Sequence, residues 1–98
     1  MPLSTPEEFE GRVADTEVAL HAAAVEAGMV VTGDRRVTEG DAAALLGYAA
    51  DTLARKRITG KGPSAYGRGF AGCRVSYRLS DLAAWIEAGR EIFGDNPD

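Results

Sequence analysis

The sequence is poor in the residues that most often bind metals or act as nucleophiles. It contains one cysteine, Cys73, and one histidine, His21. A single cysteine excludes an internal disulfide and a multi-cysteine metal site. Because His21 lies far from Cys73 in the sequence, neither a zinc site nor a Cys–His catalytic pair is supported. We expect His21 on a helix surface and Cys73 half-buried in a strand.

Long apolar runs and catalytic motifs are also lacking. No stretch approaches the roughly 18 apolar residues of a membrane span, and Met1 to Glu8 lack the basic and apolar regions of a secretory signal. The glycines around Phe70 lie in a predicted hairpin turn, not between a strand and a helix, so they do not form a phosphate loop. We therefore expect a cytoplasmic protein that is not an enzyme and has no cofactor, small-molecule ligand or membrane partner.

The net charge of −4 conceals an uneven distribution of charge. Residues 1–33 carry six acidic residues and one basic residue, and residues 79–98 carry five acidic and one basic. Residues 34–78 carry nine basic and four acidic residues. A basic middle between acidic ends suggests a face that binds a polyanion, and the alternative is chance clustering on a solvated surface.

The first 36 residues predict an acidic helix and a connector. Thr5 can cap the helix, Pro6 occupies its first position, and Glu8 completes a capping box. Gly28 is a plausible stop. Apolar residues recur at helical spacing and form one stripe: Phe9, Val13, Leu20, Ala24 and Ala27. Val18 and Val25 lie off this stripe, so a second side of the helix is also a candidate for burial.

Two short helices are expected next. Thr38 can cap the first of them with Asp41 three residues on, and Gly47 ends it. The second runs from Asp51 to Thr59, with Leu53 and Ile58 facing inward. The glycines and Pro63 in residues 60–63 forbid its continuation.

After residue 63 the spacing of apolar residues changes from that of a helix to the alternation of a strand. Residues 64–68 and 73–78 predict two strands joined by a turn at residues 69–72, which makes a hairpin. Ser80 can cap a last helix, and its apolar face holds Leu82, Trp85 and Ile86. Residues 95–98 are expected to be a frayed tail.

This order of elements predicts a mainly α fold with a small β-hairpin, in the layout of a winged helix-turn-helix with an extra N-terminal helix. The winged helix-turn-helix domain would span residues 37–94. A helix that enters a DNA groove must be short, exposed and held at an angle by a partner helix. Gly47 allows the sharp turn between the two helices, and the hairpin can contact phosphates beside them.

Two segments of the chain also resemble a known family. They are "VTEGDAAALLGYAADTLARKRITGKGP" and "GCRVSYRLSDLAAWIEA". Together they look like the excisionase-type branch, also called recombination directionality factors, of the MerR-like winged helix-turn-helix proteins. The resemblance covers about Val37 to Ala88. It implies a mobile-element protein that binds duplex DNA cooperatively at repeated sites, as a homo-oligomer, and directs a recombinase or regulates transcription, with RNA polymerase as a further partner.

The resemblance also implies roles for individual residues. Arg55 and Lys56 are the best candidates for contacts with base edges or flanking phosphates. The full predicted DNA-binding set comprises Asp51, Thr52, Arg55, Lys56, Arg57, Lys61, Arg68, Arg74 and Arg78. The predicted core comprises Leu45, Leu46, Leu53, Val75, Tyr77, Leu82, Trp85 and Ile86.

Some positions depart from the family pattern. Ala49 and Ala50 replace the usual capping serine or threonine of the recognition helix. Asp51 can replace that cap, or it can accept a hydrogen bond from cytosine. Phe70 can wedge against DNA, contact another protein, or fold back on the core.

The acidic first helix has two interpretations. It is either a structural helix or a surface for self-association and partner binding. The candidate oligomer contacts are Phe9, Val13, Leu20 and Phe70. The alternative function is a protein-interaction module, or a phage packaging or assembly subunit, that keeps the winged helix-turn-helix as a scaffold.

Overall fold

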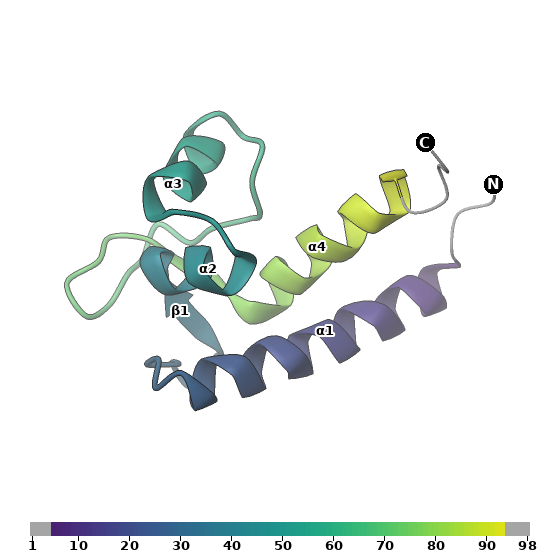
Figure 1. The fold of residues 1–98 in the computed structure, drawn as a ribbon, viewed down its shortest axis with the longest axis horizontal. Helices are drawn as coiled ribbons and strands as arrows, with labels where there is room; N and C mark the ends of the chain where they lie inside the picture. Colours follow the sequence, from purple (N-terminus) through teal and green to yellow (C-terminus); the bar gives the residue numbers. More distant parts are fainter. Residues whose placement is uncertain (1–4, 94–98) are drawn as a thin grey trace.

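The computed structural model describes residues 5–93, which form four helices and one two-stranded antiparallel sheet (Figure 1). The predicted tail, residues 95–98, and residue 94 lie outside the described residues. The elements follow in the order α1 (Pro6–Glu26), β1 (Arg36–Thr38), α2 (Glu39–Leu46), α3 (Ala50–Ile58), β2 (Ser76–Arg78) and α4 (Leu79–Phe93). The prediction of a mainly α fold with a small β component is confirmed.

The start and the end of α1 follow from local sequence signals. Thr5 and Glu8 form the predicted capping box, with the Glu8 backbone N–H donating to the Thr5 hydroxyl and the Thr5 N–H donating to the Glu8 carboxylate. The chain leaves the helix through Gly28 at φ 75°. Val18 is 66% exposed and Val25 is also exposed, so only one side of α1 is buried.

The turn between α2 and α3 also follows its local signals. The Thr38 hydroxyl caps α2 by accepting from the Asp41 backbone N–H. Gly47 ends α2 at φ 82°, a conformation that side chains other than glycine rarely adopt. Leu53 of α3 is fully buried as predicted, whereas Ile58 is 74% exposed and the prediction for it is wrong. Five residues place Ile58 about 140° around the helix from Leu53, on the solvent side.

The sheet differs from the predicted hairpin. β2 pairs with β1, with Arg36 opposite Arg78, Val37 opposite Tyr77 and Thr38 opposite Ser76. The predicted first hairpin strand contributes a single bridge, between Tyr66 and Ser76. Residues 60–75, which we call the basic loop, are otherwise irregular.

A close approach of two segments shapes the basic loop. A Cβ atom on Gly69 would lie 1.8 Å from the carbonyl oxygen of Cys73, so only glycine fits where these segments meet. Cys73 is exposed and lies outside β2, and the prediction that it is a half-buried strand residue is wrong. The crossing at Gly69 takes the place of the regular ladder that the alternating pattern predicted.

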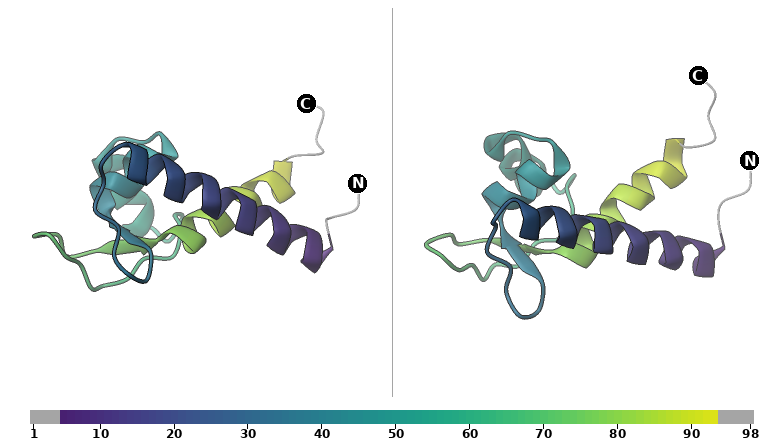
Figure 2. Two further views of the ribbon diagram at one scale, coloured as in Figure 1. Left: turned by 90° about the horizontal axis from the view of Figure 1, so that it is seen from below. Right: turned by 60° about the horizontal axis from the view of Figure 1, so that its bottom comes forward.

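Helix α4 is longer than predicted and lies alongside α1 (Figures 1 and 2). It begins at Leu79, whose N–H donates to the Arg35 carbonyl, so Ser80 lies inside the helix and does not cap it. Arg12 of α1 forms a 3.1 Å ion pair with Glu87 of α4, and the Thr16 hydroxyl donates to the same carboxylate. None of the helices in residues 5–93 combines the length and apolar character of a membrane span.

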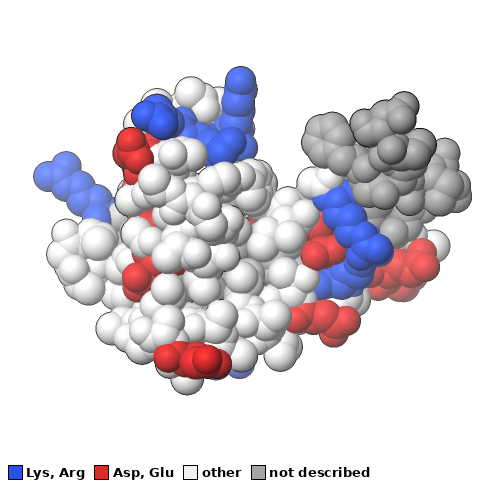
Figure 3. Space-filling view, in the orientation of Figure 1, with Lys and Arg blue, Asp and Glu red and all other residues white. Residues whose placement is uncertain are grey.

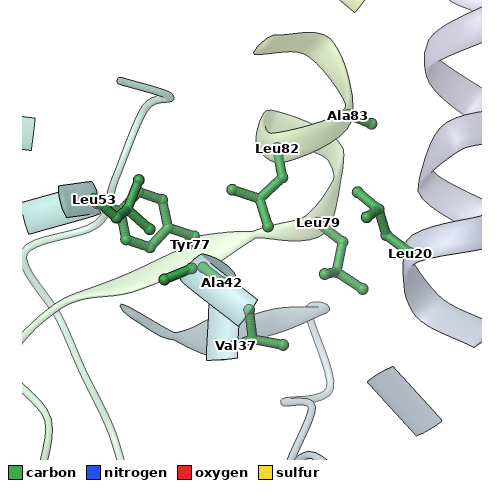
Figure 4. Close-up of a cluster of buried hydrophobic side chains, with 9 residues drawn as sticks. Leu20, Val37, Ala42, Leu53, Tyr77, Leu79, Leu82 and Ala83 are labelled. Carbon is green, nitrogen blue, oxygen red and sulfur yellow. The ribbon is translucent and has the colours of Figure 1, made fainter. Parts of the chain in front are cut away.

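One hydrophobic core joins all of these elements. Its buried residues come from α1, β1, α2, α3, β2 and α4 (Figure 4): Leu20, Val37, Ala42, Ala43, Leu53, Tyr77, Leu79, Leu82 and Ala83. Because Leu20 belongs to this cluster, α1 shares its core with residues 37–93. Trp85, predicted as core, is half-buried at the edge and meets the Tyr48 ring edge-on, with 6.1 Å between ring centroids.

Candidate nucleic-acid interface

The solvent side of α3 carries unburied positive charge. The side chain of Arg55 is 72% exposed, and its 3.5 Å contact with Asp51, itself 76% exposed, is a weak ion pair between successive helical turns. The Lys56 ammonium lies 5.4 Å from the centroid of the Tyr48 ring, which holds the lysine stem against the domain. Thr52 is half-buried near the start of the helix. Arg55 and Lys56 therefore present cations where α3 faces solvent.

The basic loop adds further cations next to α3. Lys61, Arg68 and Arg74 are all exposed. In Figure 3, Lys and Arg side chains gather above α3 and extend from the loop at the left. Acidic side chains are instead spread along α1, where Glu7, Glu8, Glu10, Asp15 and Glu26 are exposed. The uneven charge of the sequence thus becomes two differently charged regions of one surface.

Arg57 points inward and holds α3 in place. Its guanidinium donates to the Glu39 carboxylate of α2 through Nε at 2.7 Å and Nη2 at 3.2 Å. The Tyr77 hydroxyl of β2 donates to the same carboxylate at 2.8 Å. We call these three residues the Glu39 cluster. It ties α3 to α2 and to the sheet, and it removes Arg57 from the cations that are free to meet a ligand.

The Glu39 cluster also changes the proton affinities of its members. Hydrogen bonds from Arg57, and secondarily from Tyr77, lower the pKa of Glu39 below its usual 4.5 despite partial burial. The bond to Glu39 raises the pKa of Arg57. Burial, followed by the bond to Glu39, raises the pKa of Tyr77. The cluster is therefore an ionised carboxylate held by a cation and a neutral phenol at neutral pH.

Arg78, the last predicted DNA-binding residue, belongs to a second cluster on the sheet. It lies opposite Arg36, and the Asp34 carboxylate contacts both guanidiniums, at 2.9 Å from Arg36 Nε and 3.5 Å from Arg78 Nη2. Both guanidiniums also lie within 6 Å of the Tyr66 ring centroid, at 5.8 Å and 5.3 Å. Arg78 therefore lies at the base of the loop, apart from α3.

No local pattern in the sequence pointed to the partners in these two clusters. Glu39 and Arg57 are separated by a turn and most of two helices, so no helical spacing relates them. Asp34 and Arg36 lie near Arg78 only because β1 pairs with β2 across a long segment of chain. These contacts depend on tertiary structure, which a local pattern does not encode.

The four candidate oligomer contacts do not form one free surface. Leu20 lies in the core, and Val13 packs against it. Phe9 and Phe70 are half-buried. The apolar stripe of α1 is thus largely used inside the chain. The large apolar side chains that α1 does expose are Val18 and Val25.

A metal centre has no support from the described part of the chain. Within residues 5–93, no three His, Cys, Asp or Glu side chains are grouped so that they could hold a metal ion. Comparisons of the chain with protein-family models, with curated proteins and with solved structures found no match.

Proposed function

We propose that this protein binds duplex DNA through the exposed side of α3, with the basic loop as a second contact. The observation that carries the proposal is the concentration of cations on α3 and the loop that follows it, in a chain that is acidic overall. Arg55, Lys61, Arg68 and Arg74 are exposed, and Lys56 is half-buried. Cations that neutralise DNA phosphates release condensed counterions, and this supplies most of the non-specific affinity. A basic patch confined to one helix and its neighbouring loop fits that role.

The packing of α3 supports the proposal. Leu53 and Arg57 fix one side of the helix to the core and to Glu39, which leaves Arg55 and Lys56 on accessible positions. The turn at Gly47 sets α3 at an angle to α2 (Figure 1). We interpret α2, α3 and the basic loop as the two helices and the wing of a winged helix-turn-helix, with α3 in the major groove.

The exposed cations divide into two proposed roles. Arg55 and Lys56 lie on the helix and are candidates for contacts with base edges or the phosphates flanking them. Lys61, Arg68 and Arg74 lie on the loop and are candidates for phosphate contacts that carry no sequence information. Asp51 lies beside Arg55. Its carboxylate repels DNA phosphates, which restricts the positions that α3 can take along the DNA. Arg57 is not part of this set because Glu39 holds it.

The excisionase-type resemblance extends the proposal to a role. A small protein that makes a few phosphate contacts binds weakly as a monomer, and several copies on repeated sites would supply usable affinity. The proposed role is to organise DNA for a site-specific recombinase, or to regulate transcription from such repeats.

The test is a gel-shift titration with three forms of the protein. The chain with Arg55→Ala and Lys56→Ala should lose affinity for random duplex by at least about tenfold at low salt, since two phosphate-range cations are removed. Arg90→Ala is the control, because Arg90 is exposed on α4, away from α3. It should leave affinity within about twofold. Equal losses in both variants would remove α3 from the interface.

A protein-interaction module is the second candidate function, and one observation favours it. Val18 and Val25 are exposed on the acidic α1, two helical turns apart, where they give an apolar contact. A partner bound there should be unaffected by the Arg55→Ala and Lys56→Ala changes. Val18→Asp should abolish that partner's binding and leave DNA affinity intact.

A further inference from the structure

The outer face of the β1–β2 sheet carries two arginines in direct opposition. Arg36 and Arg78 are cross-strand partners. Their neighbours Val37 and Tyr77 are fully buried, so by strand alternation the two arginines occupy the opposite, outward face. Like charges placed directly across a sheet are destabilising unless a counter-charge lies between them. The arrangement therefore calls for an anion.

Asp34 is the counter-charge, and it serves the two arginines unequally. Arg36 Nε lies 2.9 Å and 3.0 Å from the two carboxylate oxygens, whereas Arg78 reaches one of them only at 3.5 Å. Arg36 has further acceptors, because its Nη1 donates to the Arg68 carbonyl at 3.0 Å and to the Ser76 hydroxyl at 2.8 Å. Arg78 Nε is buried and has no acceptor among residues 5–93.

Two further arginines are joined to this pair through the backbone. Arg35 is exposed and precedes Arg36 in the tight turn, at φ 65°, a strained conformation for a residue with a side chain. Arg68 is also exposed, and its backbone is tied to the site by the bond from Arg36. Two guanidiniums therefore share the Asp34 carboxylate, and the side chain of Arg78 remains 40% exposed.

We propose that this outer sheet face is a second phosphate-binding site, at which Asp34 occupies the place of an external phosphate. The ligand is a phosphodiester of a nucleic-acid backbone, bound by Arg78 opposite Arg36 once the Asp34 carboxylate gives way. We call it the sheet-face site. It goes beyond the proposed function because its phosphate-binding residue, Arg78, lies on β2, outside both α3 and the basic loop.

The chemistry favours a phosphate over another carboxylate. A carboxylate offers two oxygens, and both oxygens of Asp34 already face Arg36. A phosphodiester also offers two anionic oxygens, but they diverge from a tetrahedral phosphorus and can accept from two guanidinium forks at once. The Tyr66 ring lies beneath both guanidiniums and limits their movement, which reduces the entropy lost on binding.

The sheet-face site and α3 lie on different sides of the molecule. Both views in Figure 2 place the sheet on one side and α2 and α3 on the other, with the basic loop running from the end of α3 to β2. The core residues Val37, Tyr77 and Leu53 lie between them (Figure 4). A backbone bound at the sheet face is therefore a different segment from the one on α3, and one protein molecule can hold two segments.

The first experiment measures binding of inorganic phosphate by NMR titration at constant ionic strength, so that screening does not change. Asp34→Asn should raise the affinity for phosphate at least about tenfold, because it removes the competing charge. Asp15→Asn is the matched control: Asp15 is exposed on α1, and the change in net charge is the same. Adding Arg78→Gln to Asp34→Asn should abolish the gain, and the shifted resonances should include the Tyr66 ring.

The second experiment identifies the source of the phosphate. In a chain whose α3 carries Arg55→Ala and Lys56→Ala, the residual affinity for duplex should fall at least about threefold on Arg78→Gln, with Asp34 intact. This measurement does not depend on whether the Asp34→Asn variant folds. If α3 proves irrelevant to DNA but Arg78→Gln still weakens duplex binding, the proposed function fails and the sheet-face site stands.

Three results would overturn the inference. One is equal phosphate affinity in the wild-type and Asp34→Asn chains. Another is the same gain in Asp15→Asn, which would reduce the effect to net charge. The third is an affinity for duplex that Arg78→Gln does not change. Binding of an acidic peptide at this face, with no binding of duplex there, would count as the same result.

Discussion

Helices α1 and α3 are both charged surface helices, yet they are fixed in opposite ways. The N-terminus of α1 carries a full capping box at Thr5 and Glu8, so its own sequence defines where it begins. At the N-terminus of α3, Ala49 occupies the capping position, and among the described residues no side chain caps it. Helix α3 is held instead by Leu53 beneath it and by the bond from Arg57 to Glu39.

This difference follows from what each helix leaves exposed. If α3 binds DNA as proposed, it must keep one side free of the protein's own contacts, so its position has to be set from the buried side. Tertiary contacts perform that task in α3, and its exposed side can then vary without loss of the fold. Local signals suffice for α1, which packs lengthwise against α4 (Figure 1).

The largest expected effect comes from the contact beneath α3. Leu53→Ala should lower the free energy of unfolding by about 3 kcal/mol, because it leaves a cavity under a short helix. Urea denaturation measures this loss. Val18→Ala on the exposed side of α1 is the comparison and should change stability by less than about 0.5 kcal/mol. Similar effects of the two substitutions would mean that α3 is not anchored through Leu53.

The next effect concerns the Glu39 cluster. Glu39→Gln should lower stability by about 1–2 kcal/mol at neutral pH, because Arg57 loses its charged acceptor. Affinity for a specific DNA site should fall more than affinity for random duplex, since α3 loses its fixed position while Arg55 and Lys56 keep their charge. Parallel losses for the two DNAs would contradict a positioning role.

The pH dependence of the same substitution gives a separate check. The folded-state pKa of Glu39 lies below its usual 4.5, so the carboxylate stabilises the fold above about pH 4.5. That contribution is lost as the pH falls through the lower folded-state value. The stability difference between wild type and Glu39→Gln should therefore be constant near neutral pH and shrink under acid. A stability difference that grows as the pH falls would mean that the fold raises the pKa of Glu39 and does not lower it.

A smaller effect should appear when the missing cap is supplied. Ala49 has φ −71° and ψ 152°, the extended geometry of a capping residue. Ala49→Ser should therefore raise stability by about 0.5–1 kcal/mol, and Thr5→Ala should lower it by about 1 kcal/mol. Thermal unfolding of the two variants measures both changes. No gain from Ala49→Ser would mean that α3 already satisfies its first N–H groups in another way.

The smallest expected effect is that of one cation on the basic loop. Arg74→Ala should weaken binding to all duplex sequences alike and reduce the slope of log K against log salt by about one unit. Fluorescence anisotropy at several salt concentrations gives the slope. If the slope is unchanged, Arg74 makes no phosphate contact.

The sequence predicted the elements whose signals are local. Thr5, Thr38 and Gly47 act through residues within one turn, so the limits of α1 and α2 could be derived from them. The pairing of β1 with β2 could not be derived, because three-residue strands carry little periodicity. The alternation in residues 73–78 instead suggested a hairpin with residues 64–68.

The candidate site was predictable only in part. The cluster of cations from Arg55 to Arg57 is visible in the sequence, and the exposure of Arg55 follows from its spacing to Leu53. The inward position of Arg57 depends on where Glu39 and Tyr77 lie, which only the packing of three elements determines. Three neighbouring cations thus divide into two that face solvent and one that holds the helix.

The most direct test of the DNA-binding proposal is NMR chemical-shift mapping of the labelled chain with a short duplex at low salt. Shift changes are expected in α3, residues 50–58, and in the basic loop, residues 60–75, and they should disappear as salt is raised. The exposed side of α1 around Val18 should remain unchanged. Shift changes confined to α1, or none at all with duplex in excess, would contradict DNA binding through α3.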